Sequence, residues 1–331
     1  MKYYGYIIKN LIVNVYKFFN KKFINIYKIY MSNNNYYNQL IEKLQKDSSK
    51  ENLYNNIITP FSSYYLCDHF IGDEPFIYYL RGIKANNLIK NKNYDSIKEY
   101  DIVQCQGTKK NFYDIFCKEI LPKINTKIIL ITSSYRGSCP SSSTKPKIEM
   151  VLKSPKIYKW FTQNPIQHPL YDSNTKYIPF PYGVNPQTLR RYVMCLLKTK
   201  SSTKKRILLN HLHCELTHKC RKILPNVDYK SPTRFFNGIT DSKYILSPIG
   251  DRNDCFRHWE SLGLGTIPVC NINNQLKKLF KENMYYVENT EEMIKMLKDP
   301  KFLNDIYKKP NKDYISLDYW RNYILTLSGK L

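Results

Sequence analysis

Short apolar runs, each bounded by polar or turn residues, alternate with segments of helical periodicity from about residue 57 onwards. Strands that alternate with helices favour an α/β fold with parallel sheets. The predicted strands are Asp101–Cys105, Lys127–Thr132, Ile157–Thr162, Tyr177–Phe180, Arg206–Leu212, Lys243–Ser247, Thr266–Cys270 and Met284–Val287. The predicted helices are Asn111–Leu121, Thr217–Leu224, one that begins near Asp254, Thr290–Leu297 with Thr290 as its cap, and residues 314–327.

The pattern divides the chain into three parts. Residues 1–56 hold a basic amphipathic stretch and, from residue 31, a polar, asparagine-rich linker. Residues 57–190 form a first α/β domain and residues 200–331 a second, with residues 185–203 as the link. At 331 residues the chain is long enough for about two domains, each with its own core.

Residues 1–30 gather lysine and asparagine on one side of a helical projection and aliphatic and phenylalanine side chains on the other. Such a helix can lie in a lipid interface, and packing on the rest of the chain is the equal alternative. No uncharged run between Lys2, Lys9 and Lys17 exceeds seven residues, which is too short for a membrane span. No signal-peptide cleavage site follows. We expect a cytoplasmic or membrane-associated protein, with an endomembrane location as the alternative.

The formal net charge of +25 would attract polyanions such as nucleic acids. However, lysine, asparagine, isoleucine and tyrosine are enriched together along the whole chain, which is typical of an AT-rich coding sequence. The chain has no zinc-finger, RNA-recognition or helix-turn-helix motif. We therefore expect no specific nucleic-acid partner, and a basic membrane- or nucleic-acid-associated protein remains the less favoured interpretation.

The nine cysteines are scattered, and several lie inside apolar runs. Their odd number and irregular spacing predict no disulfide framework. We expect most of them to be small buried side chains in a reducing compartment.

Residues 243–270 carry the most informative pattern. The apolar run Lys243–Ser247 is ended by Pro248 and Gly250, and a short helix capped by Asn253 or Asp254 then precedes the second run. At 100° per residue, one face of this helix, toward the sheet, holds Cys255, Trp259 and Leu262. The other holds Asp254, Arg257, Glu260 and Ser261. A cation, a carboxylate and a helix N-terminus would thus meet at the carboxyl end of a strand, where we expect an anionic ligand with a hydroxylated sugar. The alternative is a solvated Arg257–Glu260 ion pair on an ordinary helix.

These residues resemble the C-terminal signature of exostosin-like glycosyltransferases, which have two Rossmann-like domains facing each other across a cleft (the GT-B architecture). The matching residues are Ser247, Pro248, Gly250, Arg257, Glu260, Gly265, Ile267, Pro268 and Val269. The close match covers residues 243–270, and a looser likeness covers about residues 100–270, including Trp160–Asn164 and Ile178–Val184.

The resemblance implies a glycosyltransferase that moves a sugar, with inversion, from a nucleoside-diphosphate donor, a UDP-sugar by preference, to a glycan or glycoprotein acceptor. It implies that Glu260 holds the donor's ribose hydroxyls and that Arg257 contacts its phosphates. The loop from Ser247 through Gly250 to Asp254 would complete the donor site. It also implies a terminal helix that crosses back to the first domain.

The base that takes the acceptor's proton has several candidates in residues 62–75. This segment holds Asp68, His69, Asp73 and Glu74, and we favour His69 or Asp73, although such a loop is more often merely solvated. The loop Ser133–Lys147 follows a predicted strand, and its Tyr135 and Arg136 are candidates to hold the acceptor or donor.

Residues 210–221 hold closely spaced metal-capable side chains, namely His211, His213, Cys214, His218 and Cys220. Zinc sites typically use CxxC pairs or HxxxH on one helical face, and neither spacing is present. The favoured interpretation is a strand–loop–helix of the donor domain that brings Arg221 near the donor phosphates.

Several motifs are absent, including GxGxxG, the P-loop, GxSxG and HExxH. The chain also lacks Asp-x-Asp, the metal-binding motif of the single-domain (GT-A) glycosyltransferases. We therefore expect no essential divalent metal, with a helix dipole and basic side chains balancing the diphosphate. A non-catalytic binding protein of the same fold is the alternative, because no residue is clearly the base.

Overall fold

The computed structural model describes residues 57–72, 94–133, 145–166, 168, 173–198, 204–210, 224, 232–250 and 252–329. All of these belong to one compact unit, Leu53–Leu80 with Ala85–Leu331. The other unit, Met1–Asn52 with Arg81–Lys84, lies outside the described residues, as do the amphipathic helix and linker predicted for residues 1–56.

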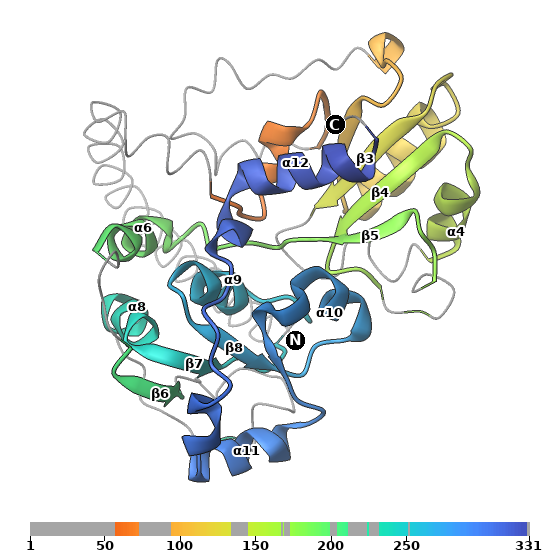
Figure 1. Cartoon of the computed structure of the whole chain (residues 1–331). Coiled ribbons are helices and arrows are strands. Elements are labelled where there is room, and N and C mark those ends of the chain that lie inside the picture. The colour runs from red at the N-terminus through yellow and green to blue at the C-terminus, as the bar shows by residue number, and fades with distance from the viewer. Residues whose placement is uncertain are drawn as a thin grey trace, which may run out of the picture. The chain divides into compact units, whose positions relative to one another are not determined.

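The first sheet has five parallel strands that lie side by side in chain order (Figure 1). They are β1 His69–Ile71, β2 Ile102–Gln106, β3 Ile128–Ser133, β4 Ile157–Gln163 and β5 Tyr177–Phe180. The helices of this part are η1 Ser62–Leu66, η3 Tyr94–Ser96, the π-helix η4 Lys109–Ile120 and α4 Lys145–Lys153.

The second sheet has four parallel strands, again in chain order. They are β6 Arg206–Leu209, β7 Ser242–Leu246, β8 Ile267–Cys270 and β9 Tyr285–Tyr286. The helices of this part are α6 Leu189–Lys198, α8 Pro232–Thr240, α9 Phe256–Gly263, α10 Asn274–Phe280, η7 Lys281–Asn283, α11 Thr290–Lys298, η8 Lys301–Asn304, η9 Lys312–Ile315 and α12 Leu317–Leu327.

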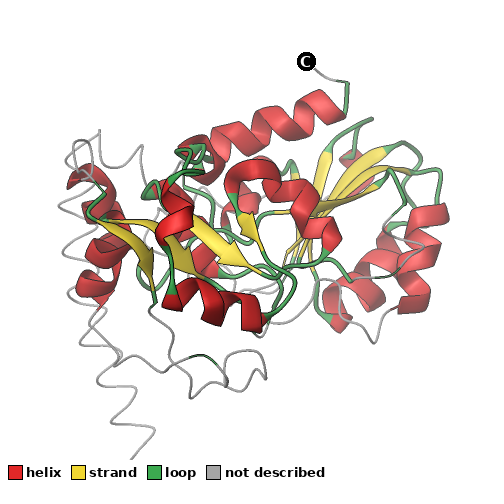
Figure 2. Cartoon of the chain, turned by 60° about the horizontal axis from the view of Figure 1, so that its bottom comes forward, coloured by secondary structure: helices red, strands yellow, loops and turns green. Residues whose placement is uncertain are grey.

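The central strands are covered on both faces, with helices packed against the sheets (Figure 2). In β3, Ile129 and Ile131 enter one core cluster, whereas Ile128 and Leu130 enter the other. Because both faces of such a strand are buried, its sequence is a continuous apolar run rather than an alternating one.

One core cluster contains residues from both sheets and from the C-terminal helix α12. The Trp320 ring of α12 lies 6.2 Å from the Phe180 ring of β5 and 5.8 Å from the Trp259 ring of α9. Just before α12, the Ile315 carbonyl accepts a hydrogen bond of 2.8 Å from the Ile58 N–H. The terminal helix therefore packs against the first sheet, as the resemblance implies.

The predicted α/β class is confirmed, with two parallel sheets that are compatible with a pair of Rossmann-like domains. Each predicted strand within the described residues is present, with β5 at the predicted bounds and the ends of the others within three residues of the predicted ones. Neither sheet reverses its strand order within the described residues, so no topological switch point marks a ligand site there.

Several local predictions were wrong. Residues 62–71 are not a loop, because they form η1 and β1, and residues 185–203 are not only a link, because they contain α6. The loop predicted for Ser133–Lys147 is too long at both ends, since Ser133 belongs to β3 and α4 begins at Lys145. The elements α8 and α10 were not predicted.

The helix caps also differ from the prediction. The N-cap of α9 is Cys255 rather than Asn253 or Asp254, because the Asp254 carboxylate accepts hydrogen bonds from the distant Tyr182 N–H and from the Trp259 indole instead. The N-cap of α11 is Asn289 rather than Thr290, and its side chain accepts a hydrogen bond from the Glu292 N–H.

Of the cysteines that the structure describes, five are buried and Cys255 is half-buried, and all are free thiols, in line with the sequence. Among the described residues, every helix is too short or too polar to cross a bilayer.

Gly183 permits a close approach between two segments. Its φ is +86°, and a Cβ there would lie 2.4 Å from the Ile58 carbonyl oxygen. Gly183→Ala is expected to lower the free energy of unfolding by more than about 1 kcal/mol, because it combines left-handed strain with this overlap. Urea-induced unfolding checks the value, and Gly329→Ala is the control, because Gly329 shares the positive φ but has open space around it. Equal losses in the two variants would contradict the role of the overlap.

Candidate functional site

The candidate site lies where β7 leads into α9. Ser247 directly follows β7, and the backbone then passes through Gly250, which is buried and donates from its N–H to the Arg252 carbonyl. Cys255 caps α9, whose first turn holds Arg257 and His258. The helix N-terminus therefore follows the carboxyl end of a parallel strand, which is the placement that the sequence predicts.

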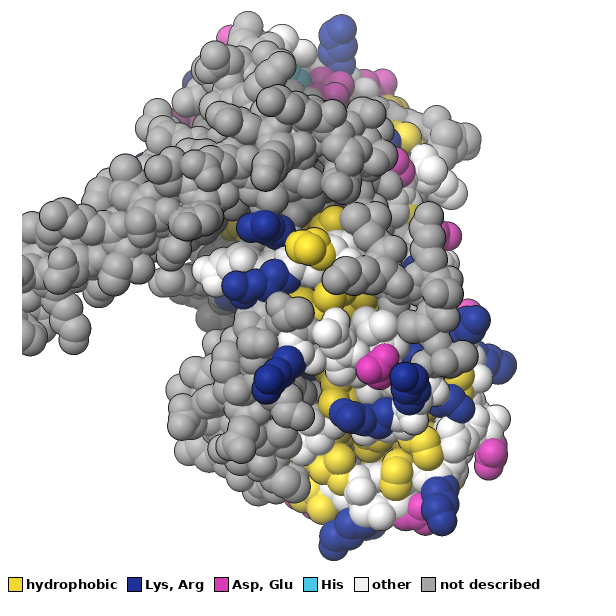
Figure 3. Space-filling view, turned by 90° about the vertical axis from the view of Figure 1, so that its left-hand side faces the viewer, with side chains coloured by type: hydrophobic (Ala, Val, Ile, Leu, Met, Phe, Trp, Pro, Cys, Tyr) yellow, Lys and Arg dark blue, Asp and Glu magenta, His cyan; other side chains and the backbone are white. Residues whose placement is uncertain are grey.

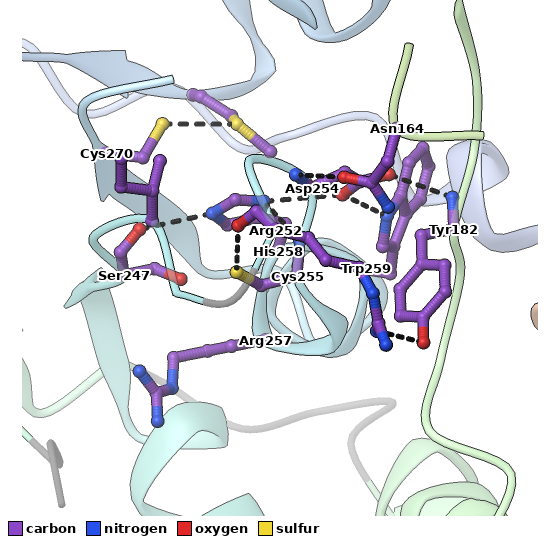
Figure 4. Close-up of polar contacts among 12 residues, drawn as sticks. Asn164, Tyr182, Ser247, Arg252, Asp254, Cys255, Arg257, His258, Trp259 and Cys270 are labelled. Carbon is purple, nitrogen blue, oxygen red and sulfur yellow. Dashed lines mark hydrogen bonds and ion pairs between the residues drawn. The ribbon is translucent and has the colours of Figure 1, made fainter. Parts of the chain in front are cut away.

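Asp254 is the centre of the polar network in Figure 4. Its side chain is fully buried, and its two oxygens accept hydrogen bonds from the Tyr182 N–H at 2.8 Å and from Trp259 Nε1 at 2.7 Å. Its own N–H donates to Asn164 Oδ1 at 2.8 Å. Since Asn164 and Tyr182 follow β4 and β5, Asp254 joins the start of α9 to the carboxyl ends of two strands of the first sheet.

His258 extends this network toward β7. One ring nitrogen, Nε2, lies 3.1 Å from the Ser247 carbonyl oxygen and donates to it, and Nδ1 lies 3.4 Å from Asp254 Oδ1. The Cys255 N–H is 3.2 Å from the same Nδ1. His258 is fully buried, so its role is to fix the loop against the first turn of α9.

Arg252 lies on the Tyr182 side of the site. Its guanidinium is 4.5 Å from the centre of the Tyr182 ring and also donates a hydrogen bond to the Tyr182 hydroxyl. The Phe256 ring stacks on Tyr182 at 4.6 Å. The cation is thereby held over an aromatic face.

Arg257 lies on a different side of the helix, away from Asn164 and Tyr182 (Figure 4). Its guanidinium is 5.8 Å from the centre of the Phe235 ring in α8. Both arginines are half-buried, but Arg252 contacts Tyr182 after β5 whereas Arg257 lies near Phe235 of α8, so their surroundings differ.

Glu260 is 4% exposed, so a solvated Arg257–Glu260 ion pair on an ordinary helix is excluded. Its Oε1 accepts a hydrogen bond of 3.5 Å from the Thr188 hydroxyl. Burial raises the pKa of Glu260 from 4.5 to about 7. The nearby Arg257 cation and the Asn185 N–H oppose this rise, since both favour the ionised carboxylate.

Two buried polar groups at the strand ends have no hydrogen-bond partner among the described residues. They are the Ser247 hydroxyl after β7 and the Asn164 side-chain N–H₂ group after β4. Asn164 also has φ of +44°, which is uncommon for a residue other than glycine. Orphaned groups and backbone strain of this kind concentrate at functional sites.

His69 begins β1, so it lies at the amino end of the first sheet. It is buried, and its Nε2 is 3.0 Å from Asp101 Oδ2. Asp68 nearby accepts a hydrogen bond from the Ile102 N–H. Ligands of parallel sheets bind at the opposite, carboxyl ends, so His69 is not placed with Ser247 and Arg257.

The other predicted site residues, Asp73, Tyr135, Arg136 and Arg221, lie outside the described residues, as does Glu74. The same is true of the metal-capable cluster of residues 210–221 beyond Asn210. In the part of the chain that the structure does describe, no three His, Cys, Asp or Glu side chains converge on a common point.

Sequence reasoning did not single out Arg252, His258 or Thr188, and it placed Asn164 and Tyr182 only in the looser likeness. The signal for His258 was its i+4 spacing from Asp254 on a short helix. The signal for Asn164 was a polar residue directly after an apolar strand. The contacts of Tyr182 and Thr188 had no signal, because their partners Asp254 and Glu260 are distant along the chain.

No family model matches the chain, and no curated protein matches it either. The resemblance to exostosin-like glycosyltransferases therefore stays a prediction.

Proposed function

We propose that this chain is a glycosyltransferase of the GT-B type, which transfers a sugar from a nucleoside-diphosphate donor to a glycan or glycoprotein acceptor. The donor's diphosphate would bind where β7 leads into α9, between Ser247 and Arg257. The observation that carries the proposal is the buried, orphaned Ser247 hydroxyl beside the first turn of α9.

The chemistry of this corner suits a diphosphate. The N-terminus of a helix carries a partial positive charge, and Arg257 adds a full charge from the first turn of α9. An arginine can also donate two parallel hydrogen bonds to a phosphate. Together these groups would stabilise the negative charge that develops on the leaving diphosphate.

Glu260 keeps its proposed role as the ligand of the donor's ribose. Its carboxyl group at present accepts from Thr188 and from the Asn185 N–H. The ribose hydroxyls would therefore replace the Thr188 hydroxyl when the donor binds. The catalytic base that takes the acceptor's proton is still proposed to be His69 or Asp73. Because His69 lies at the amino end of the first sheet, we favour Asp73.

The test is calorimetric titration of the full chain with UDP-, GDP- and CMP-sugars. We expect a UDP-sugar to bind, and Arg257→Gln to weaken that binding at least tenfold, about the effect of losing one charge-assisted hydrogen bond. Arg191→Gln on α6 is the matched control, because it removes the same charge from an exposed position.

An assay of donor hydrolysis and sugar transfer would then distinguish a transferase from a non-catalytic binding protein. Binding with turnover supports the transferase, whereas binding without turnover supports a non-catalytic nucleotide-sugar-binding protein. If none of the nucleotide sugars binds, or if the two arginine variants bind them equally well, the proposed donor site is wrong.

A further inference from the structure

A second cationic site lies at the amino ends of the strands of the second sheet. Lys204, which is half-buried, precedes β6, and its ammonium group donates to the Leu264 carbonyl at 2.9 Å and to Thr266 Oγ1 at 2.8 Å. Thr266 is itself held in place, because its hydroxyl lies 2.6 Å from the Ile239 carbonyl oxygen. The Lys204 ammonium is therefore anchored to the backbone just before β8.

Lys312 approaches the same point from the C-terminal segment. A Cβ at Gly265 would lie 3.0 Å from Lys312 Cε and 3.9 Å from Lys204 Cε. Gly265 has φ of +73°, so glycine suits both the backbone and the space above it. The bare backbone thus lets two lysine side chains converge on one spot.

A third lysine, Lys309, adds to the positive charge around Lys204. Burial, followed by the charges of Lys312 and Lys309, lowers the pKa of Lys204 to about 8, while Asp241 opposes the shift. Lys309 and Lys312 are exposed, so their ammonium groups are accessible from solvent. Figure 3, which views the side that carries α6 and α8, shows Lys and Arg side chains with Asp and Glu side chains between them. Like charges that converge in this way cost stability unless an anion compensates them.

We propose that Lys204 and Lys312, which converge above Gly265, form a binding site for a phosphate or pyrophosphate group, with Lys309 adding positive charge nearby. Lysine ammonium groups are compact point charges that commonly bind phosphate oxygens, and each can donate up to three hydrogen bonds. The site is distinct from the proposed donor site, because Ser247 lies at the carboxyl end of β7 and the lysines lie at the amino ends of β6 and β8.

The phosphate group could come from inorganic phosphate, from pyrophosphate or from a nucleoside diphosphate. The experiment titrates each of these, at constant ionic strength, into the full chain and into the Lys309→Gln/Lys312→Gln variant. Both substitutions are at exposed positions, and circular dichroism verifies that the variant is folded. UDP is also titrated into Arg257→Gln, so that binding at the lysines is separated from binding at the proposed donor site.

We expect wild type to bind phosphate, and pyrophosphate more tightly, because the latter carries more charge. The double variant should bind at least tenfold more weakly, about the effect of one lost charge-assisted hydrogen bond. The matched control is Lys123→Gln/Lys153→Gln, which removes two exposed charges from the first part of the chain and should change the affinity less than about twofold.

A second readout reports on Lys204 itself. Acetylation with acetic anhydride transfers an acetyl group to the neutral amine and releases acetate, and mass spectrometry of peptides measures the rate at Lys204. Phosphate should slow this reaction severalfold in wild type, because it covers the amine and favours its protonated form. The double variant should show no such protection.

The proposal is overturned if saturating phosphate leaves acetylation of Lys204 unchanged, or if the double variant and its control bind phosphate equally well. It is also overturned if duplex DNA binds while phosphate and pyrophosphate do not, since that result indicates a diffuse polyanion surface. Failure of UDP-sugars to bind would contradict the proposed function and leave this site unaffected.

Discussion

Replacing Asp254 with alanine is expected to lower the free energy of unfolding by about 3–5 kcal/mol, the usual cost of removing one partner from a buried charged network. The substitution leaves the Tyr182 N–H and the Trp259 Nε1–H buried without an acceptor. Each unsatisfied buried donor costs about 1–3 kcal/mol.

Urea-induced unfolding measures this loss, and Asp254→Asn refines it. Asparagine keeps one acceptor oxygen and turns the other into a donor, so one of the two N–H groups stays unsatisfied and we expect an intermediate loss of about 2 kcal/mol. Asp114→Asn is the control, because it breaks the Lys118 ion pair at an exposed position and should cost less than about 1 kcal/mol.

Hydrogen exchange locates the effect. In Asp254→Ala the Tyr182 amide should exchange faster, since its acceptor is gone, whereas amides in the centre of β3 should keep their order of protection. If Asp254→Ala were no more destabilising than Asp114→Asn, the network would not be what joins α9 to the ends of β4 and β5.

The strands could be predicted because burial on both faces makes each of them an apolar run. Ile128–Ser133 is the clearest case, since all of its side chains are buried. β1 was missed because it is only three residues long and begins with the polar residue His69, whose Nε2 lies 3.0 Å from Asp101 Oδ2. The short α10 was missed because its seven residues span too few turns for the periodicity to be detected.

The candidate site was predicted in outline and not in its contacts. The spacing of residues 243–270 placed a helix N-terminus after a buried strand, and that placement is correct. The partners of Asp254 could not be predicted, because Tyr182 and Asn164 are 72 and 90 residues away in the chain. The same tertiary contacts explain the wrong cap, since a carboxylate that accepts from Tyr182 and Trp259 is no longer available to the first turn of α9.

The helix-face prediction for α9 was also incomplete for a physical reason. A helical projection separates the face of Trp259 from that of Glu260, and a lone soluble helix would expose the second face. In the structure both are buried, because the segment before α6 covers Glu260 through Thr188 and Asn185. By burying the Glu260 carboxyl group, this segment raises its pKa and makes the stability of the protein depend on pH.

Glu260→Gln is expected to make the chain more stable than wild type at pH 8, by up to about 3 kcal/mol, with little difference at pH 4.5. The pKa of Glu260 rises on folding from 4.5 to about 7, so the folded state binds more protons than the unfolded state between these values. The contribution of this carboxyl group to stability is thus fully present below pH 4.5 and is lost as the pH rises through 7. Glutamine resembles the neutral carboxyl group at every pH and escapes the loss.

Urea-induced unfolding of wild type and Glu260→Gln at several pH values between 4.5 and 8 tests this, and the difference between the two proteins cancels the titration of all other groups. Glu291→Gln, at an exposed position in α11, should shift stability by less than about 1 kcal/mol at either limit. A wild type that is the more stable protein at pH 8 would mean that Arg257 outweighs burial and that the carboxylate is held ionised. In that case Glu260 would already be ionised when a ribose ligand binds. The expected result instead requires the donor's hydroxyls to bind a carboxyl group that is about half-protonated near pH 7.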